Sequence, residues 1–208
     1  FSESGDEKRG IWVVECPATA RRGGIRPQCR SCPGFYCPES RFAFTPGLPG
    51  ESGVVGWFAQ SGGHCVRFLH MAANRGVRFS KAAGIGNALD LDGADFMEYF
   101  AQDEATKVIC GYLEGLKDGR RFLRAAQRAS QTKPVIIHKG GYTAAGAKAT
   151  VSHTGALAVD EQVWETLCRQ SGIIRVYSID EIVDTLLPFV FLPPLVGRNV
   201  AIFGYGGG

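Results

Sequence analysis

A short run of small residues has the composition of a phosphate-binding turn. Ser61-Gly62-Gly63 lies where a helix is expected to begin. Such a turn presents unpaired backbone N–H groups and the positive end of the helix dipole, and glycines let an anion approach the backbone closely. A tight strand-to-helix turn with Ser61 as N-cap would use the same residues. The run therefore predicts either a phosphate cradle or a simple helix cap.

A histidine and a carboxylate could complete such a site. His153 lies between Ser152 and Thr154, and Glu114 directly follows an apolar run. A neutral imidazole is a nucleophile near pH 7, and a carboxylate bonded to one ring nitrogen decides which nitrogen attacks. A surface or capping histidine, and a carboxylate paired with a nearby arginine or lysine, are the structural alternatives. Placement of all three groups at one crevice would favour the chemical role.

The elements that must position these groups are apolar runs alternating with segments of helical period. The runs of strand character cover residues 54–58, 77–83, 108–113, 135–137 and 173–177. Near-continuous apolar strands separated by amphipathic helices predict a parallel sheet covered on both faces, because each right-handed crossover lays a helix over one face. We therefore expect an α/β, flavodoxin-like three-layer fold with about five parallel strands over residues 54–190. Pro188 should end or kink the last helix near Leu187.

Ligands of open parallel sheets bind beyond the carboxyl ends of the strands. Small and polar residues follow the predicted strands in four places: Gln60-Ser61-Gly62-Gly63, Gly84-Ile85-Gly86-Asn87, Glu114-Gly115 and Lys139-Gly140-Gly141, the last continuing to Ser152-His153-Thr154-Gly155. We expect these segments to converge on one crevice. Lys139 is a weaker candidate for a phosphate contact there.

The two ends of the chain differ from this pattern. Residues 1–53 are rich in Gly, Pro, Cys and Arg and lack sustained periodicity, so we expect a linker or the remnant of another domain. Residues 191–208 resemble a linker and a strand entering a glycine-rich turn, which predicts the truncated start of a further α/β domain. The sequence is accordingly interpreted as a fragment.

Composition excludes several function classes. Lys and Arg number 23 against 20 for Asp and Glu, and the net charge of +3 gives no strong field for nucleic acid or an acidic membrane. The longest apolar stretch, 186–196, contains three prolines and is shorter than the roughly 20 residues of a membrane span. Four of the seven cysteines fall in the first 40 residues, unlike a disulfide framework, so we expect a reducing compartment, the cytoplasm.

Five motifs in a fixed order carry a resemblance to a known family. They are Gln60-Ser61-Gly62-Gly63, Gly86-Asn87-Ala88-Leu89-Asp90, Tyr112-Leu113-Glu114-Gly115, Lys133-Pro134-Val135 and Ser152-His153-Thr154-Gly155-Ala156-Leu157-Ala158. From about residue 38 to 184 the chain resembles the succinyl-CoA-synthetase-like flavodoxin domain of NDP-forming acyl-CoA synthetases. That family includes the ADP-forming acetate–CoA ligases. The run from Ser152 to Ala158 is the most specific motif.

The resemblance implies a phosphohistidine relay. In that family a loop histidine, matching His153, takes a phosphoryl group from an acyl phosphate and passes it to ADP, and the reverse reaction uses ATP. The helix opened by Ser61, Gly62 and Gly63 would cradle the phosphoryl oxygens. Glu114 matches the glutamate that orients the histidine. Phosphoryl transfer needs mainly positioning and charge stabilisation, so the histidine, the glutamate and the phosphate-binding turn would suffice for the transfer step at this site.

The resemblance also implies cofactors and partners. These are CoA, ATP or ADP and Mg²⁺, held mainly by a CoA-binding domain and an ATP-grasp domain or subunit, together with a small carboxylic acid or its acyl-CoA, in an oligomeric assembly. Residues 1–53 would be what remains of the CoA-binding domain, although the family's Gly-Pro-Asn-Cys stretch is replaced by residues 26–34. The chain alone is therefore expected to be inactive.

Two other functions stay open. A non-catalytic regulatory or binding module, as in some acetyltransferase fusions, shares the fold but generally lacks the phosphorylatable histidine, so His153 argues against it. A zinc-binding segment at residues 16–37 would use four thiolates, although the spacing includes a single C-x-x-C: Cys16, Cys29, Cys32 and Cys37. Asp90, Asp92 and Asp95 could attract Mg²⁺, but Asp92 is more typical of a helix cap, and we predict no metal site.

Overall fold

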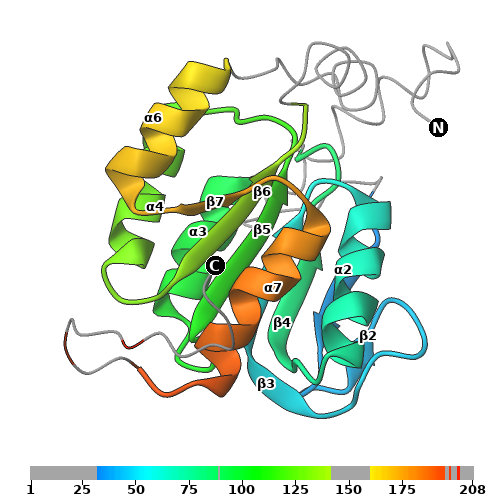
Figure 1. Cartoon of the computed structure of the whole chain (residues 1–208). Helices are drawn as coiled ribbons and strands as arrows, with labels where there is room; N and C mark the ends of the chain where they lie inside the picture. The colour runs from blue at the N-terminus through cyan, green and yellow to red at the C-terminus, as the bar shows by residue number, and fades with distance from the viewer. Residues whose placement is uncertain (1–31, 89, 142–159, 195–196, 198–200, 202–208) are drawn as a thin grey trace, which may run out of the picture.

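The computed structural model describes residues 32–88, 90–141, 160–194, 197 and 201. Strands and helices alternate along the chain (Figure 1). The elements are β1 (Gly34–Cys37), β2 (Phe42–Ala43), β3 (Ser52–Ala59), α2 (Gly62–Asn74), β4 (Phe79–Gly84), α3 (Gly93–Gln102), β5 (Val108–Leu113), α4 (Gly119–Ser130), β6 (Val135–Lys139), α6 (Glu161–Ser171), β7 (Ile174–Val176) and α7 (Ile179–Phe191).

All the strands join one seven-stranded sheet in the order β2-β1-β4-β3-β5-β6-β7. The five strands from β3 to β7 run parallel, which confirms the predicted core of the fold. β1 and β2 are additional and antiparallel, and they lie within the segment expected to be irregular. Strands of four and two residues are too short to show a hydrophobic period, so their pairing could not be inferred from the sequence.

Helices cover both faces of the sheet, as the predicted three-layer fold requires (Figure 1). α2 and α7 pack on one face, where Trp57, Phe68 and Ile182 belong to one apolar cluster. α3, α4 and α6 pack on the other, where Phe58 and Trp164 belong to a second cluster. The neighbours Trp57 and Phe58 thus point to opposite faces, as successive residues of a strand do.

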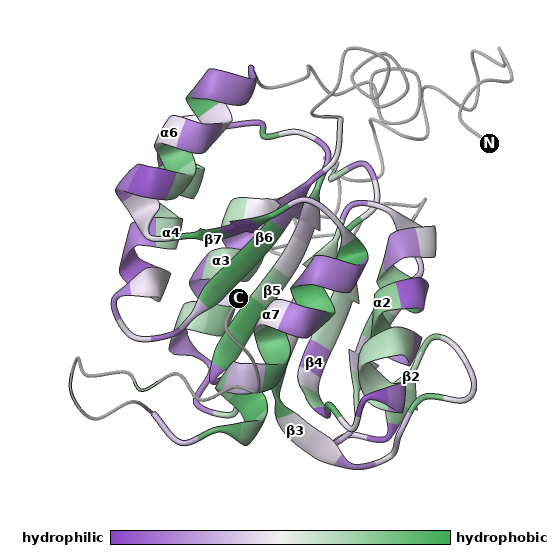
Figure 2. Cartoon of the chain, viewed as in Figure 1, coloured by the Kyte–Doolittle hydropathy of each residue, from purple (hydrophilic) through white to green (hydrophobic). Residues whose placement is uncertain are grey.

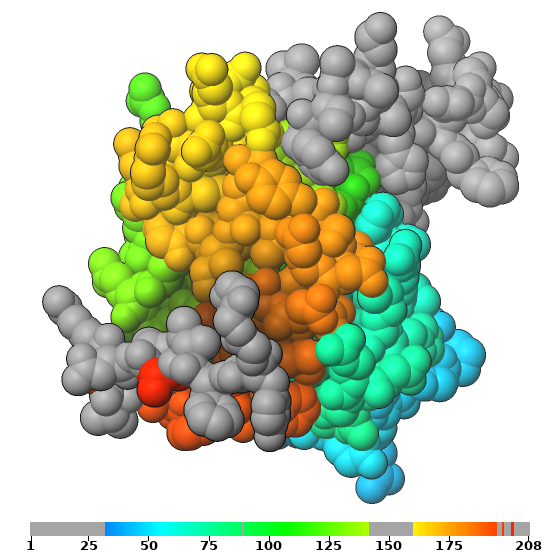
Figure 3. Space-filling view, in the orientation of Figure 1, coloured from blue at the N-terminus to red at the C-terminus, as the bar shows by residue number. Residues whose placement is uncertain are grey.

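The distribution of apolar residues and the molecular surface agree with this packing. In Figure 2 the strands between the helix layers are largely apolar, while the outward sides of the helices carry hydrophilic residues. In Figure 3 the side chains of α6, α7 and α2 form the surface in front of the sheet. None of the helices in the described ranges combines the length and the hydropathy that a membrane span needs.

The last helix corrects the expectation placed on Pro188. α7 continues through the proline to Phe191, instead of ending near Leu187. Pro188 lacks an N–H, but its carbonyl still accepts a hydrogen bond from the N–H of Leu192 at 3.0 Å. Val190 packs against the apolar cluster beneath α7. The rest of this turn is exposed, with exposed fractions of 43% for Phe189 and 56% for Phe191, so the helix continues past the proline although little of its last turn is buried.

Candidate functional site

The predicted cradle lies where β3 passes into α2. Ser61 has extended backbone angles, and its side chain accepts a hydrogen bond from the N–H of His64 at 3.4 Å, which confirms the N-cap. A Cβ on Gly62 would make ordinary contact with Pro33 at 3.5 Å, and one on Gly63 would meet nothing within 4 Å. Packing therefore does not require glycine at Gly63. The first N–H groups of a helix have no acceptor within the helix, and here the side chain of Ser61 satisfies that of His64.

The buried side chain of Gln60 ties the cradle to the next strand. Its Oε1 accepts hydrogen bonds from the backbone N–H of Gly115, at 2.9 Å, and of Glu114. Its Nε2 donates to the carbonyl of Gly115 at 3.0 Å, and its own N–H donates to the carbonyl of Tyr112 at 3.0 Å. The carboxyl ends of β3 and β5 are locked together, so the residues that follow them, Ser61 and Glu114, are brought into one site.

Glu114 is buried, with 5% of its surface exposed. The phenol hydroxyl of Tyr112 donates a hydrogen bond to its Oε1 at 3.1 Å. The two side chains meet because residues two apart on a strand lie on the same face. Burial and the nearby carboxylate raise the pKa of Tyr112 well above its usual value, so the phenol remains a donor at any working pH.

Three rings line this part of the site. The imidazole of His64 stacks on the ring of Tyr112, with centroids 4.3 Å apart and planes 6° apart, and its Nδ1 lies 3.0 Å from Oγ of Ser61. The ring of His138 lies 5.3 Å from that of Tyr112. Nδ1 of His138 is 3.2 Å from the carbonyl of Val176, which can only accept, so this nitrogen carries the proton. A continuous chain of contacts thus runs from Ser61 to Glu114.

Sequence reasoning missed His64 and His138. Parallel pairing places His138 directly beside Tyr112, a register that composition alone does not give. His64 falls in the first turn of α2, three residues after its cap, and that spacing could have drawn attention to it. Burial lowers the pKa of His138, and the neighbouring His64 acts in the same direction.

Lys139 is not brought to this site. It follows His138 on β6 and therefore points to the opposite face of the sheet. Its Nζ donates to the carbonyl of Gly140 at 3.3 Å, and burial lowers its pKa. The charges that affect it come from Glu161, Arg175 and Asp160, near the start of α6 and on β7. The structure therefore gives no support to Lys139 as a phosphate contact at the cradle.

His153 lies outside the described residues, within the stretch 142–159. The described chain enters that stretch after Gly141, from the carboxyl end of β6. There the N–H of Gly140 donates to the carbonyl of Leu113 at 2.7 Å. The chain emerges at Asp160, the N-cap of α6. The approach of His153 to Glu114 and to the cradle stays a prediction.

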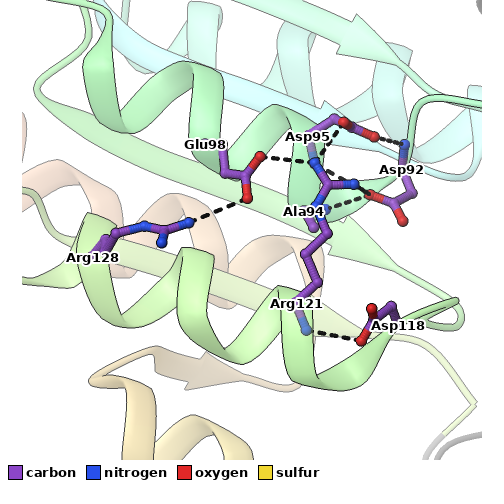
Figure 4. Close-up of polar contacts among 7 residues, drawn as sticks. All are labelled: Asp92, Ala94, Asp95, Glu98, Asp118, Arg121 and Arg128. Carbon is purple, nitrogen blue, oxygen red and sulfur yellow. Dashed lines mark hydrogen bonds and ion pairs between the residues drawn. The ribbon is translucent and has the colours of Figure 1, made fainter.

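The acidic group at the start of α3 serves as a cap and an ion-pair network. Asp92 accepts from the N–H groups of Ala94 at 2.9 Å and Asp95 at 3.2 Å, which confirms it as the N-cap. Arg121 of α4 lies 2.7 Å from Asp95 and 2.8 Å from Glu98, with Asp92 at 3.8 Å (Figure 4). These carboxylates join α3 to α4 through one guanidinium, and their hydrogen bonds raise the pKa of Arg121.

The proposed zinc ligands are only partly visible. Cys16 and Cys29 lie outside the residues that the structure describes, so the four-thiolate set cannot be assembled from Cys32 and Cys37 alone. Within the described ranges, no three His, Cys, Asp or Glu side chains converge as metal ligands would. This part of the chain offers no composite metal site.

Comparison with known proteins agrees with the resemblance drawn from the motifs. Residues 52–188 match the model of the succinyl-CoA ligase like flavodoxin domain. The alpha subunit of an ADP-forming acetate–CoA ligase I from Pyrococcus furiosus is 36% identical over 212 residues, covering 100% of this chain and 45% of the relative. An ADP-forming acetate–CoA ligase from Methanocaldococcus jannaschii is 40% identical over 210 residues, covering 100% and 29%. The chain thus spans less than half of either relative.

A solved structure extends the likeness to three dimensions. It is a dinucleotide-forming acetyl-coenzyme A synthetase 1 from Ca. Korarchaeum cryptofilum in complex with phosphate and ADP. It matches with a TM-score of 0.81 at 31% identity, over 91% of this chain and 42% of that one. The family model covers more than half of the chain, and the mostly parallel sheet flanked by helices agrees with the flavodoxin-like fold of that domain. The chain belongs to the succinyl-CoA ligase like flavodoxin domain family, as found in ADP-forming acetate–CoA ligases.

Proposed function

We propose that this chain supplies the phosphohistidine-bearing domain of an NDP-forming acyl-CoA synthetase. The enzyme would convert acyl-CoA, ADP and phosphate into carboxylic acid, CoA and ATP, reversibly. The observation that carries the proposal is the coupling of two groups at the carboxyl end of the sheet. Gln60 holds the start of α2 against the end of β5, so Gly63 and the buried carboxylate of Glu114 follow two strand ends that are tied together, which supports a shared site.

In this proposal His153 is the group that carries the phosphoryl. An imidazole nitrogen of His153 bonds to the phosphorus of an acyl phosphate while the bond from phosphorus to the acyl oxygen breaks, releasing the carboxylate. A terminal oxygen of ADP then forms the new bond to phosphorus, and the P–N bond breaks to return the imidazole. Glu114 orients His153 by accepting from its other ring nitrogen. The N–H groups after Ser61 stabilise charge on the transferring oxygens.

The remaining components are assigned to other parts of the enzyme. Mg²⁺ and the nucleotide are assigned to an ATP-grasp domain or subunit, as the resemblance to NDP-forming acyl-CoA synthetases implies. CoA is assigned to a CoA-binding domain; of residues 1–53, which the sequence assigned to its remnant, β1 and β2 belong to the sheet, so only the part before β1 keeps that assignment. Residues 54–190 form the flavodoxin-like domain, and residues 191–208 begin a further domain. We place the oligomeric enzyme in the cytoplasm, in keeping with the unpaired thiols of Cys65, Cys110 and Cys168.

The test combines the chain with the ATP-grasp subunit of an ADP-forming acetate–CoA ligase and ATP labelled in its γ-phosphate. The chain should acquire an acid-labile, base-stable label, and His153→Ala should abolish it. His70→Ala, a substitution elsewhere on α2, is the matched control and should retain the label. Absence of label from the unsubstituted chain would contradict the proposal and favour a non-catalytic module on the same fold.

A further inference from the structure

Tyr112 is a buried, titratable residue to which the proposed phosphoryl transfer gives no role. Its exposed fraction is 5%, and it lies on β5 two residues before Glu114. Its hydroxyl is 3.1 Å from Oε1 of that carboxylate. A buried carboxylate is costly unless it accepts hydrogen bonds, and a bond to the charged form is among the stronger ones. The phenol therefore both stabilises and directs the group that the proposal assigns to orient His153.

The surroundings of Tyr112 leave its ring a single position. His64 of α2 stacks almost parallel on one side, and its own ring is held by Oγ of Ser61 at 3.0 Å. His138 of β6 lies beside it, fixed by its bond to the carbonyl of Val176. At the far end, a Cβ on Gly140 would fall 2.5 Å from the phenol oxygen, so the backbone after β6 closes over the hydroxyl. Three elements thus clamp one side chain.

We propose that Tyr112 is a positioning residue for phosphoryl transfer: clamped between His64, His138 and Gly140, its hydroxyl fixes the rotation of the Glu114 carboxylate. The inference rests on the proposed function, since it concerns the carboxylate that orients His153. A carboxylate has about four lone-pair sites, so the bond from Tyr112 leaves capacity for other donors. Because rate depends steeply on the placement of such groups, a carboxylate turned away from His153 would slow the reaction without weakening nucleotide binding.

The first measurement separates this role from a general contribution to folding. Tyr112→Phe keeps the ring and its stacking but removes the hydroxyl. In the labelling assay it should lower the maximal rate of His153 phosphorylation about 10- to 100-fold, the loss expected for a hydrogen bond to a charged group. The ATP concentration at half-maximal rate should not change. Tyr99→Phe, which removes a hydroxyl from an exposed tyrosine of α3, is the matched control and should behave as the unsubstituted chain.

A double-substitution cycle tests whether Tyr112 acts through Glu114. If it does, Tyr112→Phe added to Glu114→Ala should have no further effect on the rate. Effects that multiply, or a Tyr112→Phe rate equal to that of the unsubstituted chain, would overturn the inference while leaving the phosphohistidine proposal standing. If the unsubstituted chain acquired no label, the phosphohistidine proposal would be overturned, and the positioning role of Tyr112 with it.

A spectroscopic measurement that needs no turnover completes the test. With ¹³C-labelled glutamate carboxyls, the Glu114 resonance is assigned by its loss in Glu114→Gln. It should shift in Tyr112→Phe at neutral pH, because the ring remains and only the hydroxyl is lost. The same resonance should not move in Tyr99→Phe. An unmoved resonance in Tyr112→Phe would show that the phenol does not hold the carboxylate.

Discussion

Gln60 and Gly115 are joined by a pair of hydrogen bonds in which one side-chain amide satisfies both the N–H and the carbonyl of one residue. Oε1 of Gln60 accepts from the N–H of Gly115 at 2.9 Å, and Nε2 donates to its carbonyl at 3.0 Å. The amide imitates a neighbouring strand at a point where β3 and β5 have ended. The parallel pairing of the two strands is thereby extended by one step, and the loops that carry Ser61 and Glu114 acquire a fixed relative position.

Gln60→Ala should lower the free energy of unfolding by about 2–3 kcal/mol, because it removes several buried hydrogen bonds and leaves their backbone partners unsatisfied. Urea unfolding of the two chains measures the difference. Gln127→Ala is the matched control. Gln127 donates to the carbonyl of Gln170 at 3.2 Å on the exposed side of α4, so its loss should cost less than about 0.5 kcal/mol. Equal effects of the two substitutions would show that Gln60 does not lock the strands.

Gly63→Val tests the open space above the first turn of α2. The new side chain should be accommodated, because a Cβ there meets nothing within 4 Å, and thermal stability should hardly change. The label on His153 should fall more than about tenfold, because the side chain obstructs the approach of a phosphoryl group to the helix N–H groups.

Gly119→Val is the control for that experiment. Gly119 also lies in the first turn of a helix, behind the cap Asp118, and a Cβ there also meets nothing within 4 Å. The label should be unaffected by this substitution. Equal loss of label in both variants, or none in either, would argue against a cradle at Gly63.

Arg121→Gln should lower the free energy of unfolding by about 1–2 kcal/mol. The substitution leaves the carboxylates of Asp95 and Glu98, both close to the guanidinium in Figure 4, without their shared counter-charge. Arg120→Gln changes the exposed neighbour and should stay within about 0.5 kcal/mol. Chemical unfolding at low and high salt checks both values. The Arg121 effect should shrink as salt screens the carboxylates.

His138 predicts a dependence of stability on pH. Burial lowers its pKa in the folded chain below the ordinary 6.5, so the unfolded chain takes up the proton first as the pH falls. The contribution of neutral His138 to the free energy of unfolding is therefore fully present above pH 6.5. It is lost as the pH falls from there toward the lower pKa of the folded state. His138→Asn retains a donor for the carbonyl of Val176 but does not titrate. Its free energy of unfolding should fall less between pH 7 and pH 5, and parallel curves for the two chains would contradict this account.

The sequence was sufficient for the elements with a clear period. The strand expected at 108–113 is β5 to the residue, because a buried central strand is an unbroken apolar run. Ser61 and Asp92 were identifiable as caps, because a cap depends on neighbours in sequence. Helix caps and unbroken apolar strands depend on adjacent residues, so the sequence alone predicts them.

Relations set by register or by packing were not accessible in the same way. His138 adjoins Tyr112 through the pairing of β5 with β6, and Gln60 reaches Gly115 across 55 positions of sequence. Pro188 was expected to end or kink the last helix near Leu187, whereas α7 continues to Phe191. The parts of the candidate site that the sequence predicts are therefore those within single loops, whereas the contacts that couple the loops depend on strand register and packing.

The two outermost strands of the sheet bear on how its edges avoid pairing with strands of other chains. In the described part of the chain, β2 has two residues and β7 has three, while the strands between them have four to eight. An unpaired strand edge is a template for another chain, and short edges offer few backbone groups to pair with. Without β1 and β2, the six-residue, largely buried β4 would form that boundary. The small antiparallel addition thus shields the parallel core from growing sideways into aggregates.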